Sequence, residues 1–225
     1  KVFYTGLYHA LIHPNVLSDV NGEYPAMESA EIRTAEGNRY TVFSLWDTYR
    51  NLHQLLTLVY PERQLEMVRS MVGMYREWGW LPKWELYGRE TFTMEGDPSI
   101  PVIVDTWMKG LRDFDMDAAY EAMRKSATTP GARNRMRPDI DPYIEKGYVP
   151  LGFYARDLSG DNSVSHALEY YIADHALSLL ADSLGKKDDA ALFRARSLGY
   201  KNYYSTESGT FRPITKEGKF LTPFD

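Results

Sequence analysis

The sequence contains no cysteine among its 225 residues. This absence excludes disulfide bonds, thiolate metal sites and a cysteine nucleophile within the chain. It does not identify a cellular compartment, because proteins without cysteine occur in reducing and oxidising surroundings alike.

Positive charge and long apolar runs are also scarce. The net charge is −5 and no basic stripe is present, which argues against a nucleic acid as the partner. No apolar run approaches the roughly 18 residues of a membrane helix. The opening KVFYTGLYHA lacks the architecture of a signal peptide, so we expect any such signal to have been removed or to lie outside this chain.

The residues that are present describe a globular chain that is rich in aromatic rings. Hydrophobic residues make up 44% and charged residues 25%, which is typical of folded proteins. Aromatic residues reach 14%, with 17 Tyr and 5 Trp. Such a content is consistent with a large core or with carbohydrate binding, in which rings stack on the apolar faces of sugars. Composition alone does not separate these two interpretations.

Hydrophobic spacing predicts a mainly α fold made of helix hairpins with long loops and short β-hairpins. The predicted pairs start near residues 47, 98 and 163, a spacing too irregular for tandem helical repeats. We therefore expect residues 1–225 to be a single incomplete (α/α)6 toroid with about half of its helices. The individual predictions are the end of a helix before Pro14, a loop with a β-hairpin over 15–42, helices over 47–59 and 61–78, a long loop over 79–97, helices from 98 and over 115–131, a polar segment over 130–162, helices over 163–185 and 187–204, and a final hairpin over 209–225.

Three clusters combine acids with aromatic or basic residues at predicted helix entrances or in loops. Hydrolysis of a glycosidic bond requires two carboxylates, so each cluster is a candidate site. The structural alternatives are helix capping for Asp47 and Asp97, and ion pairs with Lys83 or Arg89 for Glu85 and Glu90. The clusters are Trp46-Asp47, then Trp84, Glu85, Tyr87, Arg89 and Glu90, and finally Glu95 with Asp97.

We expect no metal site within the chain itself. None of the five histidines has zinc-site spacing, and the i, i+4 pair His9 and His13 lacks the acid of a hydrolytic zinc motif. Residues 19–23 and 157–162 offer calcium-like oxygen donors but lack a complete twelve-residue loop, so turns are the better interpretation.

Several long strings together resemble the catalytic domain of glycoside hydrolase family 92. They include FYTGLYHALIHPNVLSDVNGEY, YTVFSLWDTYRNLHQLLTLVYPER, LPKWELYGRETFTMEGDPSIPVIVDTWMKG and SVSHALEYYIADHALSLLADSLG, and they follow one another from residue 2 to residue 225. The resemblance implies an exo-acting, inverting and calcium-dependent α-mannosidase that releases terminal mannose from N-glycans or mannan. It further implies an N-terminal β-sandwich followed by an (α/α)6 domain, and a secreted, periplasmic or cell-surface location.

The resemblance also implies which parts of the family's site this chain lacks. The general acid follows the PFD block in the family, and the general base and the calcium loop lie farther on. We therefore expect residues 1–225 to contain no catalytic acid, base or Ca2+ ligand and to be inactive alone. The remainder of the parent polypeptide would be its partner, and the glycan its substrate.

The WDT string is the part of the family's site that can be transferred to this chain. The resemblance implies that Asp47 hydrogen-bonds hydroxyls of the terminal mannose and that Trp46 forms a wall of the pocket. Glu85, Arg89 and Glu90 would touch the substrate or support the residues that do.

Two alternatives to the α-mannosidase remain open at this point. The chain could belong to another (α/α)6 glycosidase with Glu85, Glu90 or Glu95 as catalytic acids. It could also be a carbohydrate-binding scaffold without chemistry of its own.

Overall fold

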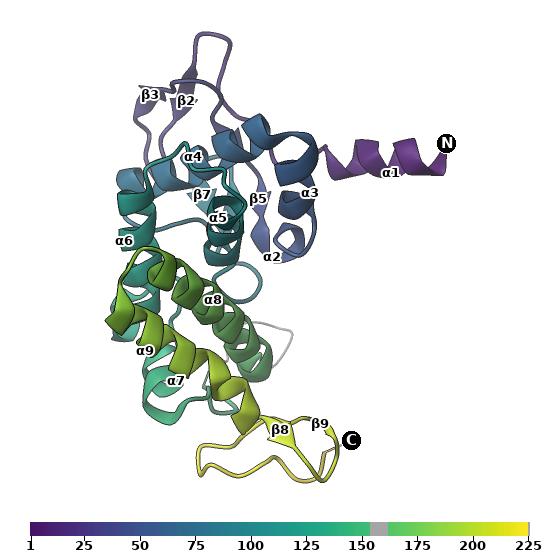
Figure 1. Ribbon diagram of the computed structural model, residues 1–225, viewed down its shortest axis with the longest axis vertical. Coiled ribbons are helices and arrows are strands. Elements are labelled where there is room, and N and C mark those ends of the chain that lie inside the picture. Colours follow the sequence, from purple (N-terminus) through teal and green to yellow (C-terminus); the bar gives the residue numbers. More distant parts are fainter. Residues whose placement is uncertain (154–161, 225) are drawn as a thin grey trace. The chain divides into compact units, whose positions relative to one another are not determined.

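The computed structural model describes residues 1–153 and 162–224, and the account below is restricted to them. Two compact units make up the chain. The first contains residues 1–94 and 98–123, and the second contains 95–97 and 124–225. Both are mainly helical with small sheets, which agrees with the predicted mainly α fold with short β-hairpins (Figure 1). No helix in the described residues is long and apolar enough to cross a membrane.

The helices of the first unit follow the predicted pattern with one exception. The predicted helix over 61–78 is confirmed: Pro61 occupies its first turn, and Gly79 ends it in the left-handed conformation at φ 90°. The helices are α1 (Val2–Ala10), α2 (Leu45–Thr48), α3 (Leu52–Val59), α4 (Pro61–Trp78), α5 (Ser99–Met108) and α6 (Met116–Thr128), whose last five residues belong to the second unit.

The exception is the single helix predicted over 47–59, which is two helices, α2 and α3. Asn51 has φ −156° and ψ −30°, and this φ lies far outside the helical range. The side chain of Gln54 donates a hydrogen bond to the carbonyl oxygen of Tyr49 at 2.7 Å, in place of an intrahelical N–H. The hydrophobic period runs through this interruption, which is why spacing alone predicted one helix.

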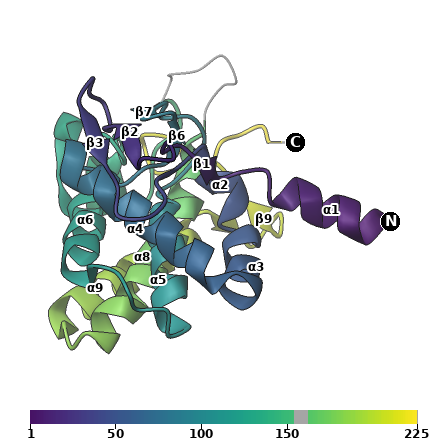
Figure 2. The ribbon, with the colours of Figure 1, turned by 90° about the horizontal axis from the view of Figure 1, so that it is seen from above.

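Residues 15–41 form the predicted hairpin region, as two small antiparallel sheets. Strand β1 (Asn15–Val16) pairs with β4 (Tyr40–Thr41), and β2 (Glu23–Pro25) pairs with β3 (Ile32–Thr34). Glu77 of α4 fastens this region, because its carboxylate accepts hydrogen bonds from Arg39 and from the hydroxyl of Tyr24, each at 2.8 Å. Figure 2 shows β2 and β3 beside α4.

A three-stranded antiparallel sheet joins segments that are 40 residues apart in the sequence. Its order is β5 (Phe43–Ser44), β6 (Trp84–Leu86) and β7 (Arg89–Glu90). The long loop predicted over 79–97 is therefore wrong in part, because it contains the β6–β7 hairpin. Tyr87 and Gly88 make the two-residue turn with φ 49° and 83°, the signature of a type I′ turn. Tyrosine in the first turn position concealed this hairpin, because asparagine and aspartate are the usual residues there.

The second unit is built on a helix hairpin, α8 (Ser163–Ser183) with α9 (Lys187–Ser197), which lie side by side in Figure 1. Helix α8 matches the predicted 163–185 to within two residues, and its N-cap is Asn162 without a side-chain cap bond. The polar segment over 130–162 contains a helix that the sequence did not predict. The remaining elements are a short 3-10 helix (Gly131–Arg133), α7 (Ile140–Lys146), a second 3-10 helix η2 (Leu198–Asn202), β8 (Tyr204–Ser205) and β9 (Thr210–Phe211).

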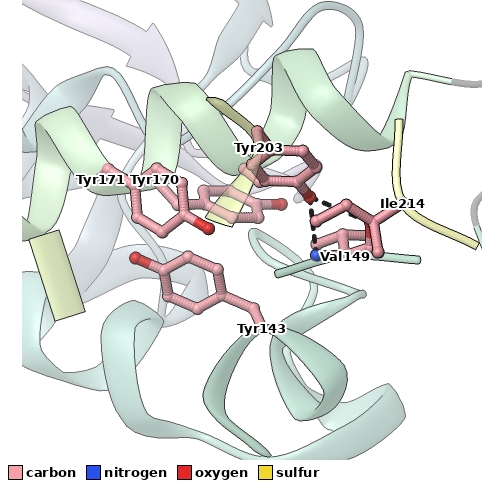
Figure 3. Packing of buried hydrophobic residues seen from close by; sticks show 7 residues of the cluster. Tyr143, Val149, Tyr170, Tyr171, Tyr203 and Ile214 are labelled. Carbon is pink, nitrogen blue, oxygen red and sulfur yellow. Dashed lines mark hydrogen bonds between the residues drawn. The ribbon is translucent and has the colours of Figure 1, made fainter. Parts of the chain in front are cut away.

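Tyrosine fills much of the core of this second unit. The cluster in Figure 3 combines four buried tyrosines with Val149 and Ile214. The hydroxyl of Tyr203 accepts a hydrogen bond from the backbone N–H of Val149 at 2.8 Å and donates one to its carbonyl oxygen at 2.9 Å. Part of the aromatic content thus serves packing, with each phenol given a polar partner. The four tyrosines are Tyr143, Tyr170, Tyr171 and Tyr203.

Candidate carbohydrate-binding site

Asp47 lies where strand β5 ends and helix α2 begins. It is the third residue of α2, its side chain is exposed, and its Oδ2 accepts a short hydrogen bond from the hydroxyl of Ser44. No side chain caps the backbone N–H groups of α2, so the capping interpretation of Asp47 is wrong. Within the described residues, Oδ1 of Asp47 accepts no hydrogen bond. The carboxylate therefore has one fixed oxygen and one oxygen open to a ligand.

Trp46 lies beside Asp47 and is oriented by Arg50. The guanidinium of Arg50 lies 4.9 Å from the ring centres of both Trp46 and Tyr49, and its Nε donates to the carbonyl oxygen of Trp46 at 3.1 Å. Trp46 is half-buried, and its buried indole Nε1 has no hydrogen-bond partner in the part of the chain that the structure describes. The cation–π contact and the backbone bond together hold the ring beside the acid.

A chain of neutral hydrogen bonds supports α2 from the interior of the unit. The hydroxyl of Thr48 lies 3.1 Å from Nε2 of His53, and Nδ1 of His53 lies 2.9 Å from Oε1 of Gln64. Gln64 in turn donates to the hydroxyl of Thr106 at 2.9 Å. Burial lowers the pKa of His53 to about 4, so this imidazole is neutral near pH 7. The chain connects α2, α3, α4 and α5.

The three-stranded sheet brings the first two sequence clusters together. Ser44, which holds Asp47, lies opposite Trp84 in the β5–β6 pairing, and Phe43 lies opposite Glu85. Because neighbouring side chains on a strand point to opposite faces, Phe43 and Glu85 share the buried face, and Ser44 and Trp84 share the other. On the face opposite to the buried one, Ser44, which donates a hydrogen bond to Asp47, therefore lies next to the half-buried ring of Trp84.

Glu85 is fully buried and accepts hydrogen bonds from three separate groups. They are the hydroxyl of Thr41 at 2.8 Å, the N–H of Val42 at 3.1 Å and the N–H of Gly88 at 2.6 Å. Burial raises the pKa of Glu85, although the bonds from Gly88 and Thr41 act in the opposite direction. These bonds tie the hairpin turn to β4, and they give this carboxylate a structural role.

Glu90 has a similar environment on the next strand. Its carboxylate accepts hydrogen bonds from the N–H groups of Lys83, Trp84 and Phe92 at 2.7, 3.0 and 2.8 Å. Burial raises its pKa, and the backbone donors oppose that rise. Arg89 differs: its side chain is 74% exposed and lies 3.8 Å from Glu28, which was not among the predicted partners.

The third sequence cluster belongs to a buried charge network in the second unit. Asp97 accepts hydrogen bonds from Arg137 at 2.9 Å and from Ser126 at 2.6 Å, and Arg137 also donates to Asp174 at 2.7 Å. Burial alone would lower the pKa of Arg137, but the two carboxylates hold it well above its usual value. The N-cap of α5 is Pro98 without a side-chain cap bond, so the capping interpretation of Asp97 is wrong. Glu95 Oε2 lies 2.9 Å from Nε2 of His166.

Some participating residues were not singled out from the sequence. Ser44 and Arg50 contact the predicted pair directly, and Arg137 pairs with Asp97 of the third cluster. Only the i+3 spacing of Ser44 and Asp47 within FSLWD could have indicated the first contact. Arg137 lies 40 residues from Asp97, and no local signal connects the two.

The described residues contain no cluster of charged or histidine side chains arranged to bind a metal. No group of three or more His, Cys, Asp or Glu side chains in that part of the chain is placed to hold a metal ion. Asp97 and Asp174 each form an ion pair with the guanidinium of Arg137. The calcium-like segment 157–162 lies outside the described residues, apart from Asn162.

Comparison with known protein families identifies the family of this chain. A family described as the glycosyl hydrolase family 92 catalytic domain matches residues 1–225, which is the full length of the chain. The chain belongs to this family. The resemblance stated from the sequence is thereby confirmed.

Two solved members of family 92 match the structure closely. The α-mannosidase BT3965 from Bacteroides thetaiotaomicron has 37% sequence identity and a TM-score of 0.89; the match covers 99% of this chain and 29% of that one. The inverting mannosidase BT2199 from the same organism has 30% identity and a TM-score of 0.88, with 99% and 30% covered. BT3965 was also solved in complex with mannoimidazole.

A fungal relative matches at greater distance. An uncharacterized secreted glycosidase of Arthroderma benhamiae is 26% identical over 216 residues, which cover 94% of this chain and 23% of the relative. The family 92 chain thus spans less than a third of the length of each of these relatives.

Proposed function

We propose that residues 1–225 are part of an exo-acting, inverting and calcium-dependent α-mannosidase that releases terminal mannose from N-glycans or mannan. Support comes from membership of family 92 and from the names of the two solved relatives, an α-mannosidase and an inverting mannosidase. The observation that carries the proposal is the exposed carboxylate of Asp47 beside the oriented ring of Trp46.

Asp47 acts in this proposal by holding the sugar in position. Its open Oδ1 accepts a hydrogen bond from a mannose hydroxyl, and a bond to an ionised carboxylate is stronger than one between neutral groups. The bond from Ser44 fixes the other oxygen and so reduces the freedom that the side chain would lose on binding. Trp46 contributes an apolar wall against a sugar face.

Glu85 and Glu90 act by supporting the site, because their oxygens accept bonds from backbone and hydroxyl donors of the hairpin. These bonds keep Trp84 of β6 opposite Ser44 of β5, the strand that leads into α2 and Asp47. This arrangement favours a supporting role over catalytic acid chemistry for both glutamates. Arg89, at the exposed edge of the same hairpin, is the residue of this loop best placed to reach a glycan.

The complete catalytic domain, in this proposal, is an (α/α)6 toroid of which residues 1–225 form one half. An N-terminal β-sandwich and the second half of the toroid belong to the same polypeptide. Inversion requires an acid and a base far enough apart to admit a water molecule. Both groups and the Ca2+ ligands lie outside this chain, so residues 1–225 alone are inactive. The location is secreted, periplasmic or cell-surface, supported by the secreted fungal relative.

The test compares Asp47→Ala with Glu62→Ala in the complete polypeptide, on an aryl α-mannoside. Glu62 is a matched control, because it is also an exposed acid in the first turn of a helix. We expect Asp47→Ala to lower kcat/KM by about a hundredfold or more, as loss of a transition-state hydrogen bond does. Glu62→Ala should leave it unchanged. Equal activities, or activity of the unchanged enzyme that is indifferent to a calcium chelator, would contradict the proposal.

A further inference from the structure

Tyr87 has an unfavourable backbone conformation although its side chain is mostly exposed. It is the first residue of the type I′ turn between β6 and β7, with φ 49°. A residue with a Cβ is disfavoured there, which is why asparagine, aspartate and glycine predominate at this position. Tyr87 is 60% exposed, and within the described residues its hydroxyl has no hydrogen-bond partner. Backbone strain of this kind is typical of functional sites.

The turn is held by backbone atoms and does not depend on the tyrosine side chain. The N–H of Tyr87 donates to the hydroxyl oxygen of Thr41 at 2.8 Å, and the N–H of Gly88 donates to the carboxylate of Glu85 at 2.6 Å. The carbonyl oxygen of Gly88 accepts a hydrogen bond from the N–H of Glu28 at 2.7 Å. Any residue except proline could make these bonds at position 87. The reason for a tyrosine therefore lies outside the turn.

One face of the three-stranded sheet leads from Asp47 to this turn. Ser44, whose hydroxyl donates to Asp47, lies opposite Trp84 in the pairing of β5 with β6. Leu86 shares the face of Trp84, because alternate residues of a strand point the same way, and it lies opposite Arg89 of β7. None of these sheet residues is buried, in contrast to Phe43, Glu85 and Glu90 on the other face.

The length of this face separates Tyr87 from the terminal sugar. Tyr87 follows Trp84 by three residues, so it lies about 10 Å from the level of Ser44 along the strand. Because β5 and β6 are antiparallel, the chain leaves Ser44 toward Asp47 in the direction away from the turn. One sugar ring cannot contact Asp47 and Tyr87 together. A ligand that reaches both residues is an oligosaccharide.

We propose that Tyr87 forms a binding subsite for a neutral sugar unit of the glycan that lies beyond the terminal mannose. The tyrosine ring stacks on the apolar face of that sugar. The guanidinium of Arg89, which is 74% exposed on the paired strand, donates hydrogen bonds to the sugar hydroxyls. This inference rests on the proposed function, because it requires the terminal mannose to bind at Asp47.

The test compares two substitutions of Tyr87 in the complete polypeptide. Tyr87→Asn suits the turn but removes the ring, and Tyr87→Phe is the matched control that keeps the ring and loses only the hydroxyl. Kinetics are measured on oligosaccharides prepared from yeast mannan, and the terminal sugar site is probed separately through inhibition by mannoimidazole. Hydrogen exchange of the peptide that contains residues 84–90 reports the stability of the hairpin.

We expect Tyr87→Asn to raise KM for the oligosaccharides about tenfold at unchanged kcat, because a distant stacking contact stabilises substrate and transition state equally. Inhibition by mannoimidazole should stay within about twofold, because this compound does not extend beyond the terminal sugar site. Hydrogen exchange of the hairpin should become about fivefold slower, because asparagine relieves the strain of the turn. Tyr87→Phe should resemble the unchanged enzyme in all three measurements.

A more stable hairpin that binds oligosaccharide less well is not the result of a purely structural role. An unchanged KM in Tyr87→Asn would overturn the proposal and leave the proposed function intact. Faster hydrogen exchange in this variant would also overturn it, because the ring would then stabilise the hairpin by packing on the protein. An equally large rise in KM in Tyr87→Phe would exclude stacking. Absence of α-mannosidase activity from the unchanged enzyme would contradict the proposed function and this inference with it.

Discussion

The entrance of α2 and the β6–β7 hairpin are neighbours on one sheet, and both carry acids next to tryptophan, but their acids serve different purposes. Asp47 is exposed and accepts one hydrogen bond, from Ser44. Glu85 and Glu90 are buried, and each accepts bonds from three groups of the chain. An acid can bind a ligand only with an oxygen that the fold has left open, and of these three described carboxylates only that of Asp47 meets this condition.

The largest expected effect is on stability and comes from the hairpin. Glu85→Ala leaves the hydroxyl of Thr41 and the N–H groups of Val42 and Gly88 buried without their acceptor. Loss of three such bonds is expected to lower the free energy of unfolding by about 4 kcal/mol. Urea unfolding of the complete polypeptide checks this value. A loss of activity without a loss of stability would instead mean that Glu85 touches the substrate.

The second largest effect concerns His53, in the buried hydrogen-bond chain that supports α2. The pKa of His53 is about 4 in the folded state against 6.5 in the unfolded state, so the unfolded chain binds an extra proton between these values. The free energy of unfolding therefore falls by about 3 kcal/mol as the pH is lowered from 6.5 to 4. The measurement is the difference in pH dependence between the unchanged protein and His53→Gln, because other titrating groups cancel. Identical pH profiles for the two proteins would show that His53 is not held neutral.

The smallest effect is expected at Arg89. Its exposed side chain and the 3.8 Å separation from Glu28 describe a weak surface pair, so Arg89→Ala should change the stability by less than about 0.5 kcal/mol. A rise in KM for a mannose oligosaccharide, at unchanged stability, would show that the edge of the hairpin contacts the substrate. An unchanged KM would restrict substrate binding in this region to the start of α2.

The sequence predicted long elements well because one hydrophobic period continues through each of them. Helices α4 and α8 were predicted to within about two residues, and Pro61 and Gly79 marked the ends of α4. The interruption between α2 and α3 was missed because it depends on single contacts, such as that of Gln54 with Tyr49. The β6–β7 hairpin was missed because its turn uses Tyr87 where asparagine would be the usual signal.

Residue types suggested a set of candidate site residues but did not distinguish their roles. Trp46, Asp47, Glu85, Arg89 and Glu90 were all named from the sequence, and the structure places them on or next to one sheet. The difference between an open and a saturated carboxylate depends on partners such as Ser44, Thr41 and Gly88. These partners become visible only once strand register is known. The partner of Asp97 could not be predicted either, since Arg137 lies 40 residues away in the sequence.

The most direct test of the difference between the two regions is the affinity of the complete polypeptide for mannoimidazole, measured by calorimetry. The compound is suitable because it was bound in the structure of the relative BT3965. We predict that Asp47→Ala weakens binding by about a hundredfold, or about 2.7 kcal/mol, and that Glu90→Gln leaves the affinity of the folded protein within about twofold. Unchanged affinity in Asp47→Ala, or a large loss confined to Glu90→Gln, would contradict the account.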